Sequence, residues 1–315
     1  MKMILDLDTG IDDALAIAYA LGLPGVELIG VTNCFGNVTI DTAVQNTLDL
    51  LELLGHPEVP VFEGASCPWG ADGYTLAPHK FKIHGQNGIG NVELPRAKAQ
   101  KSAVSAVDFI LDSARRYGPD LALVATAPLT NLANAIAKDK NAVGRIGRIS
   151  IMGGALTVPG NRTPFAEANI CDDARAARAV MESGIPLTLV GLDATLKTRV
   201  TGRDIDPWRQ LGTPAADAVI RMCEYYYTNE YDDASFGGAI HDPLAVEVAV
   251  APESAAYLPI NLTVETEGPG AGRVIGDLRR LDQKEKSARV CVDVDGPAFV
   301  KKFVDTIGGL LAEQR

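Results

Sequence analysis

The chain has 315 residues, of which 47% are apolar and 22% are charged, and it carries a formal net charge of -11. Nucleic acid and anionic membrane surfaces bind basic patches, so we expect neither as a partner. Five scattered cysteines without a C-x-x-C pair argue against a disulfide framework or a zinc site, and favour a reducing compartment. No signal peptide and no apolar run of roughly 20 residues is recognisable, so the sequence predicts a cytoplasmic protein.

Predicted strands and helices alternate along the first two thirds of the chain. Strands are expected at residues 3–7, 26–33, 59–62, 121–125, 149–152 and 186–190, and helices at 12–21, 39–54, 103–117, 128–137 and 172–183. Residues 64–94 are rich in Gly and Pro and predict a long irregular loop. Such alternation indicates an α/β fold with a mainly parallel central sheet and helices on both faces.

The last third of the chain continues this pattern with one change. A mostly helical stretch follows residue 213 and reaches about residue 250, which we interpret as a helical insertion near 200–250. Strands are expected at 260–264, 272–277 and 288–292, and a closing helix at 297–313. Because no repeat or linker divides the chain, we expect residues 1–315 to form a single open, Rossmann-like domain.

Polar side chains follow the predicted strands. In open α/β sheets ligands bind at the carboxyl ends of the strands, so these residues are the site candidates. They are Asp8, Asp12, Asp13, Asn33, Asn37, Thr126, Asn161, Glu167, Asn169 and Asp193. Nearly all carry oxygen atoms, which suit a hard cation or a polyol.

The segment ILDLDTGIDD places Asp6, Asp8, Asp12 and Asp13 at one strand-to-helix corner. Helix capping is enough to explain either Asp12 or Asp13 taken alone, because acidic residues are favoured in the first turn of a helix. It does not explain why Asp8 joins them. Three carboxylates at one corner favour a divalent cation, Ca²⁺ or Mg²⁺ rather than zinc, and the spacing does not choose between the two. Asp6 is left without a chemical role.

Two histidines lie in polar, Gly-rich segments. His241 and Asp242 in GGAIHDPLAV are either a surface histidine with a capping aspartate, or a proton donor with a further metal carboxylate. His84 in KIHGQNGIGN lies in the predicted loop, where a solvated histidine is the competing interpretation.

The segment GNRTPFAEANI contributes Asn161, Glu167 and Asn169 before a predicted helix. Asn is common in turns for backbone reasons, so each residue alone is consistent with a structural role. Together, two amides and one carboxylate suit the adjacent hydroxyls of a sugar.

The start of the chain also resembles that of haloacid-dehalogenase-like phosphatases, which have an apolar strand followed by Asp-x-Asp. In that alternative Asp6 would be the nucleophile and Asp8 the acid and base. The late acidic pair that such enzymes require is poorly matched at Gly276-Asp277. The phosphatase interpretation also leaves His241 and Asp242 without a function.

The ordered set of motifs resembles the inosine–uridine-preferring nucleoside hydrolase family. DTGIDDALAI is similar to that family's N-terminal signature, and APLTNLA, MGG, GNRTPFAEANI, GLDATLKTRV and HDPLAV follow in the family's order. The resemblance spans essentially the whole chain. It implies a Ca²⁺-dependent N-glycosidase that splits a ribonucleoside into ribose and a free base, and it points to a homodimer or homotetramer.

The resemblance implies a role for each matched residue. Asp8, Asp13, the carbonyl of Thr126 and Asp242 would hold Ca²⁺, Asp8 would activate a metal-bound water, and His241 would act as the acid toward the leaving base. Asp12, Asn161, Glu167 and Asn169 would bind the ribose, with Asn37 near them and His84 near the base. A calcium-dependent nucleoside- or ribose-binding protein without catalysis is a further alternative.

Base preference stays open in the sequence. Some relatives activate purines with a tryptophan, whereas Trp69 and Trp208 match no motif, which favours a histidine-type, broad or pyrimidine-leaning enzyme. The aromatic stretch EYYYTNEYDD at 224–233 either lines the base or forms a packed helix face.

Overall fold

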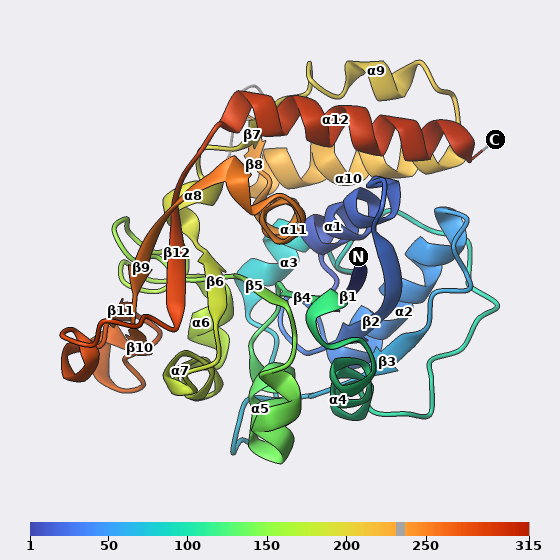
Figure 1. The fold of residues 1–315 in the computed structure, drawn as a ribbon. Coiled ribbons are helices and arrows are strands. Elements are labelled where there is room, and N and C mark those ends of the chain that lie inside the picture. Colours follow the sequence, from blue (N-terminus) through green and yellow to red (C-terminus); the bar gives the residue numbers. More distant parts are fainter. Residues whose placement is uncertain (231–236, 315) are drawn as a thin grey trace.

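The computed structural model describes residues 1–230 and 237–314. Its central sheet has eight strands: β1 Lys2–Leu7, β2 Glu27–Asn33, β3 Val61–Glu63, β4 Leu121–Ala125, β5 Arg148–Met152, β6 Leu187–Val190, β9 Ala255–Ile260 and β12 Ala288–Val294. Their order is β3-β2-β1-β4-β5-β6-β12-β9, and all neighbours are parallel except β12 and β9 (Figure 1). The predicted mainly parallel sheet is confirmed.

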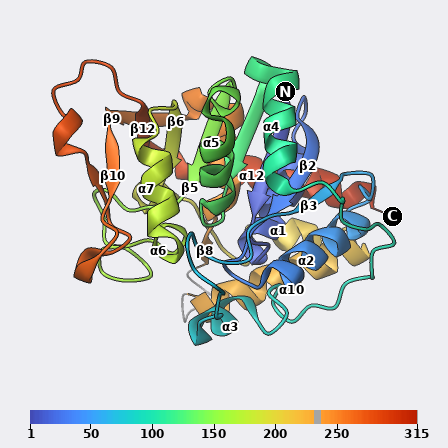
Figure 2. The ribbon, with the colours of Figure 1, turned by 90° about the horizontal axis from the view of Figure 1, so that it is seen from below.

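Helices cover both faces of this sheet, as predicted (Figures 1 and 2). One face carries α1 Ile11–Gly22, α2 Ile40–Leu53, α10 Pro214–Glu230, α11 His241–Val250 and α12 Gly296–Glu313, and the other carries α4 Ala106–Tyr117, α5 Thr130–Val143 and α7 Ala174–Glu182. Shorter helices are α3 Pro78–His84, α6 Ala168–Asp172, α8 Leu192–Thr195 and α9 Asp206–Arg209. None of the described helices is long and apolar enough to cross a bilayer.

The corner that joins β1 to α1 lies at the centre of the molecule. β1 is buried from Met3 to Leu7, which is typical of a parallel strand covered on both faces. α1 is buried from Ile11 to Ala20, and its alanines let it pack closely against α11 and α12. Side chains at this corner are therefore held rigidly and largely out of water.

The predicted long loop at 64–94 contains the helix α3, which sequence periodicity did not indicate. Pro78 occupies its first turn, where the missing N–H costs nothing. At seven residues the helix is too short to show an apolar repeat, and its stability comes from contacts with α10. This helix brings His84 to the site.

The C-terminal strands differ in part from the prediction. β10 Leu262–Val264 and β11 Val274–Gly276 form a separate antiparallel pair outside the central sheet. The edge strand β9 was not expected as a strand, because its sequence AAYLPI contains Pro259, and proline is confined to edge strands such as this one. A second small pair joins β7 Arg199–Val200 to β8 Gly238–Ala239.

Candidate active site

The site lies where the strand order of the sheet reverses. From β1 the chain continues outward to β2 and β3, and then returns to place β4 on the other side of β1. Ligands of open α/β sheets bind at such a switch point. Asp8 directly follows β1 and Thr126 directly follows β4, so both lie at this position as the sequence predicted.

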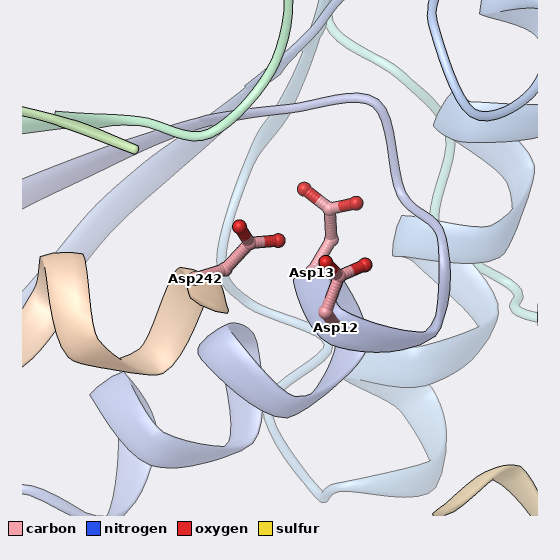
Figure 3. A group of neighbouring side chains, drawn as sticks. All are labelled: Asp12, Asp13 and Asp242. Carbon is pink, nitrogen blue, oxygen red and sulfur yellow. The ribbon is translucent and has the colours of Figure 1, made fainter. Parts of the chain in front are cut away.

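Three carboxylates meet between the first turns of α1 and α11 (Figure 3). One oxygen each of Asp12, Asp13 and Asp242 lies within 4.8 Å of the others. The three residues are 9%, 0% and 1% exposed. The positive ends of two helix dipoles face these acids and offset part of their repulsion.

The carboxylate cluster of Asp12, Asp13 and Asp242 has the chemistry of a cation site. Oδ1 of Asp12 and Oδ1 of Asp242 are buried, and neither has a hydrogen-bond donor in the described part of the chain. Burial, followed by repulsion from neighbouring acids, raises the pKa of Asp12 to about 8 and the pKa of Asp242 well above its usual range. A divalent cation reverses this effect, and an all-oxygen donor set fits Ca²⁺ or Mg²⁺.

Asp8 lies beside the carboxylate cluster and is held by the backbone. Its Oδ2 accepts a hydrogen bond from the Asn37 amide N–H at 2.5 Å, and its Oδ1 accepts one from Asn37 Nδ2 at 3.2 Å. Asn37 Nδ2 also lies 3.3 Å from Asp13 Oδ2, so this amide joins Asp8 to Asp13. Burial, and then the charge of Asp13, raises the pKa of Asp8 well above its usual range. Asp8 is thus an oriented carboxyl group joined to the carboxylate cluster through Asn37.

Thr126 connects the carboxylate cluster to the neighbouring turn. Its hydroxyl donates to Asp13 Oδ1 at 2.8 Å, and its carbonyl accepts from Asn169 Nδ2 at 2.7 Å. The carbonyl keeps a second lone pair that a cation could use. Asn169 is buried and lines the site cavity, together with Asp12, Asn37 and Thr126.

Glu167 and Asn161 also line the cavity, and both have partners in their own turn. The carboxylate of Glu167 accepts from the amides of Asn169, Ile170 and Gly154, and so caps α6. Asn161 Oδ1 accepts from the Ala168 amide. Glu167 and Asn161 therefore stabilise their own turn and also line the cavity.

Both candidate histidines are buried in the cavity wall. His84 Nδ1 accepts from the Ile11 amide at the start of α1, at 3.2 Å. His241 Nδ1 lies 2.8 Å from the Thr195 hydroxyl. Burial lowers the pKa of His84 to about 3 and the pKa of His241 to about 4, with help from nearby cations. The expectation that His84 is a solvated loop residue is excluded.

The residues that line the cavity do not include Asp6, Asn33 and Asp193, and they do not include Asp8, Asp13 and Asp242 either. Asp6 Oδ1 accepts from Thr32 and Asn131 beneath the site, so this carboxylate is not placed as a phosphatase nucleophile. Asp193 accepts from the amides of residues 156 and 157 and fixes the loop after β5. Both residues are structural.

One cavity residue, Lys80, carries no signal in the sequence, whereas another, Tyr226, belongs to a stretch that the sequence singled out. Lys80 is buried on α3, four residues before His84, and pairs with Asp172. Tyr226 on α10 lies with its ring centroid 5.9 Å from that of His84. Tyr226 belongs to the aromatic stretch 224–233, of which residues 231–233 lie outside the described part of the chain. Neither Trp69 nor Trp208 lines the cavity.

The family follows from comparison with known proteins. The sequence model of the inosine-uridine preferring nucleoside hydrolase family matches residues 3–301, and the chain belongs to this family. It is a hydrolase of the nucleoside hydrolase class, which confirms the resemblance of its motifs.

Two curated relatives and one solved structure are similar over nearly the whole chain. Uridine nucleosidase 1 of Arabidopsis thaliana is 36% identical over 277 residues, 88% of this chain and 82% of the relative. A pyrimidine-specific ribonucleoside hydrolase of Klebsiella pneumoniae is 35% identical over 303 residues, 95% of this chain and 96% of the relative. The structure of a purine-preferring ribonucleoside hydrolase from Gardnerella vaginalis superposes with a TM-score of 0.97 and 46% identity, covering 99% of this chain and 100% of the other.

Proposed function

We propose that the chain is a Ca²⁺-dependent ribonucleoside N-ribohydrolase. It adds water across the bond between ribose C1′ and the base nitrogen, and it releases ribose and the free base. The observation that carries this proposal is the buried cluster of Asp12, Asp13 and Asp242 at the switch point, with Asp8 joined to it through Asn37.

The proposed metal ligands are Asp8, Asp13, Asp242 and the carbonyl of Thr126. The orphan oxygen of Asp242 and the second lone pair of the Thr126 carbonyl support this assignment. A bound divalent cation would supply a Lewis acid that lowers the pKa of a coordinated water. Asp12 has an oxygen within 4.8 Å of oxygens of Asp13 and Asp242, and its orphan oxygen also suits a ribose hydroxyl.

In the reaction, Asp8 accepts the proton of the attacking water as the new bond to C1′ forms. The breaking N-glycosidic bond sends its electron pair to the base and leaves positive charge on the sugar. Buried carboxylates and the amide oxygens of Asn161 and Asn169 stabilise that charge. His241 donates a hydrogen bond to the departing base, and the base gains one proton overall while the water loses one.

The base is not specified by the comparisons. The two curated relatives are named for uridine and for pyrimidine nucleosides, and the structural relative is named for purines. We propose a ribonucleoside substrate whose base packs near Tyr226 and His84. The expected homodimer or homotetramer and the cytoplasmic location stay predictions.

The test measures reducing sugar released from inosine, adenosine, uridine and cytidine by the calcium-loaded enzyme. Asp8→Asn is expected to lower kcat at least about 10²-fold, the lower end for loss of a general base. Asp41→Asn, which alters an exposed acid in the first turn of α2, is the matched control and retains activity. A folded, calcium-loaded enzyme that releases no sugar from any of the four nucleosides contradicts the proposal.

A further inference from the structure

The hydroxyl of Thr195 contacts the imidazole of His241. Thr195 is the last residue of α8, the short helix that follows β6, and it is 0% exposed. Its hydroxyl oxygen lies 2.8 Å from Nδ1 of His241. The distance defines a hydrogen bond, but either atom could be the donor, and the direction decides where the imidazole proton lies.

The groups around the Thr195 hydroxyl indicate whether it donates to His241 Nδ1 or accepts from it. In the described part of the chain, His241 Nδ1 is the one hydrogen-bond partner of the Thr195 hydroxyl. If the hydroxyl accepted from Nδ1–H, its own proton would be buried without an acceptor, which is unfavourable because the lost hydrogen bond to water is not replaced. If it donates to Nδ1, its proton is satisfied, and a neutral imidazole then carries its single proton on Nε2.

We propose that Thr195 is a positioning residue that fixes His241 in the tautomer with its proton on Nε2, the nitrogen that then donates to the departing base. The proposal rests on the role of His241 in the proposed function. The opposite tautomer would present a lone pair to the base, and it would repel the electron pair that the base gains when the N-glycosidic bond breaks.

His84 shows the same arrangement without ambiguity. A backbone N–H can only donate, and the amide of Ile11 lies 3.2 Å from His84 Nδ1. The neutral His84 therefore also carries its proton on Nε2. Two cavity histidines with the same tautomer form a matched pair of donors, one fixed by the backbone of α1 and the other by the hydroxyl of Thr195.

The chain supplies a matched control for Thr195. Thr198 is buried, and its hydroxyl donates to the carbonyl of Thr195 at 2.8 Å and lies 3.3 Å from the carbonyl of Ile240. It joins the same two segments as Thr195 but does not touch the imidazole. Thr198→Val removes a buried hydroxyl from this region and leaves the partner of His241 in place.

The test compares natural nucleosides with p-nitrophenyl β-ribofuranoside, whose leaving group departs without a hydrogen-bond donor. Thr195→Val is expected to lower kcat for nucleosides about 10- to 100-fold, less than the roughly 10²- to 10⁴-fold that acid assistance supplies because the imidazole stays in place, and to lower it far less for the nitrophenyl riboside. Thr195→Ser restores the hydroxyl and most of the nucleoside activity. Thr198→Val keeps the wild-type ratio of the two activities.

Nitrogen-15 NMR of the imidazoles reads the tautomer directly. The chain has four histidines, and His241→Gln identifies the signals of His241. The wild-type enzyme is expected to show Nε2–H at His241, and Thr195→Val a mixture of both tautomers. An Nδ1–H tautomer in the wild-type enzyme overturns the proposal even if no Thr195 variant folds.

The outcomes separate this inference from the proposed function. If the wild-type enzyme hydrolyses neither substrate, the proposed function fails. If it hydrolyses both, and His241→Gln loses nucleoside activity while Thr195→Val does not, the proposed function stands and the role of Thr195 is overturned. In the His241→Gln background, Thr195→Val should cause no further loss, and a further loss also contradicts the proposal.

Discussion

Lys80 and Asp8 contact the two ends of one peptide group. Lys80 Nζ donates to the carbonyl of Gly36 at 2.8 Å, and the amide of the same peptide, that of Asn37, donates to Asp8 Oδ2 at 2.5 Å. Lys80 is itself buried and paired with Asp172. Because successive hydrogen bonds polarise one another, the lysine both strengthens and orients the contact to Asp8. The ion pair thus supports the proposed general base without touching it.

Lys80→Met is expected to affect stability and catalysis together. It leaves Asp172 without its partner, which should lower the free energy of unfolding by about 3 kcal/mol. It also releases the turn that holds Asp8, and kcat/KM should fall by about 10²-fold, the scale expected for a misplaced catalytic group. Chemical denaturation and sugar-release kinetics measure the two effects.

Two further variants separate these contributions. Lys138→Met breaks the exposed pair of Lys138 with Asp108 and should cost less than about 1 kcal/mol, with no effect on kcat/KM. Lys80→Met combined with Asp172→Leu should regain much of the stability, because an apolar pair replaces the ion pair. If the double variant also regains full activity, the lysine has no role in orienting Asp8.

Gly36 is required because the chain approaches Asp8 closely. A Cβ atom at this position would lie 1.9 Å from Asp8 Oδ2, so Gly36→Ala must displace the carboxylate or the turn. We expect kcat to fall by about 10²-fold. A Cβ atom at Gly73 would have no neighbouring atom within 4 Å, so Gly73→Ala should behave as wild type. Equal activity of the two alanine variants would contradict this account of the turn.

Calcium should stabilise the protein more strongly as pH rises. Without the cation, the pKa of Asp12 is raised to about 8, so the carboxylate cluster contributes stability at low pH that is lost as pH rises from about 4 to 8. A cation requires ionised ligands and removes this penalty. Calcium at 100 times its Kd should add about 2.7 kcal/mol.

The measurement is the shift of Tm on addition of calcium, at pH 5 and at pH 8, with magnesium in parallel. The shift should be larger at pH 8 and should disappear in Asp242→Asn. Chelation should abolish sugar release, and added calcium should restore it. A calcium shift that is independent of pH would contradict binding at the cluster of Asp12, Asp13 and Asp242.

The sequence predicted those features of the site that depend on local order along the chain. The acids of DTGIDD follow an apolar run that predicts a buried strand, and the rule that ligands bind at strand ends places them at the end of β1, where Asp12 and Asp13 meet Asp242 in the structure. Lys80 and Thr195 could not be predicted in this way. Lys80 lies on a helix of seven residues without an apolar repeat, and Thr195 acts through a contact with a residue 46 positions away.

Fold prediction failed for a similar reason at the C-terminal edge. β9 has an apolar sequence, but its Pro259 argues against a strand anywhere except at the edge of a sheet. Its place in the sheet is set by pairing with β12, which is an interaction that no local pattern reports. Asp6 was also unexplained, because its partners Thr32 and Asn131 come from other elements.

His84 should make the protein sensitive to acid. Its pKa is lowered from 6.5 to about 3 by burial, so the unfolded state binds a proton that the folded state does not between these values. The stability that this histidine contributes is present above pH 6.5 and is lost as pH falls toward 3. At pH 5 the loss is about 2 kcal/mol, at 1.36 kcal/mol for each pH unit.

His84→Gln keeps an acceptor for the Ile11 amide and removes the titration. Between pH 7 and pH 5 its free energy of unfolding should therefore fall by about 2 kcal/mol less than that of the wild type. His56→Gln, which alters a partly exposed histidine away from the cavity, is the control and should follow the wild-type curve. Parallel curves for His84→Gln and the wild type would show that His84 is not the group responsible.

We expect Asp6 to stabilise the fold and to have no catalytic role. Its Oδ1 accepts from the Thr32 hydroxyl at 2.6 Å and from Asn131 Nδ2 at 2.8 Å, and burial raises its pKa to about 6. Asp6→Asn keeps an oxygen for both donors, so nucleoside hydrolysis should stay within about threefold of wild type and stability within about 1 kcal/mol. Asp6→Ala removes the nearer acceptor of the Thr32 hydroxyl and one of the two acceptors of Asn131 Nδ2, and it should cost about 1–3 kcal/mol. A phosphatase with Asp6 as its nucleophile would instead be inactive as Asp6→Asn, so one pair of assays, sugar release and phosphate release, separates the two mechanisms.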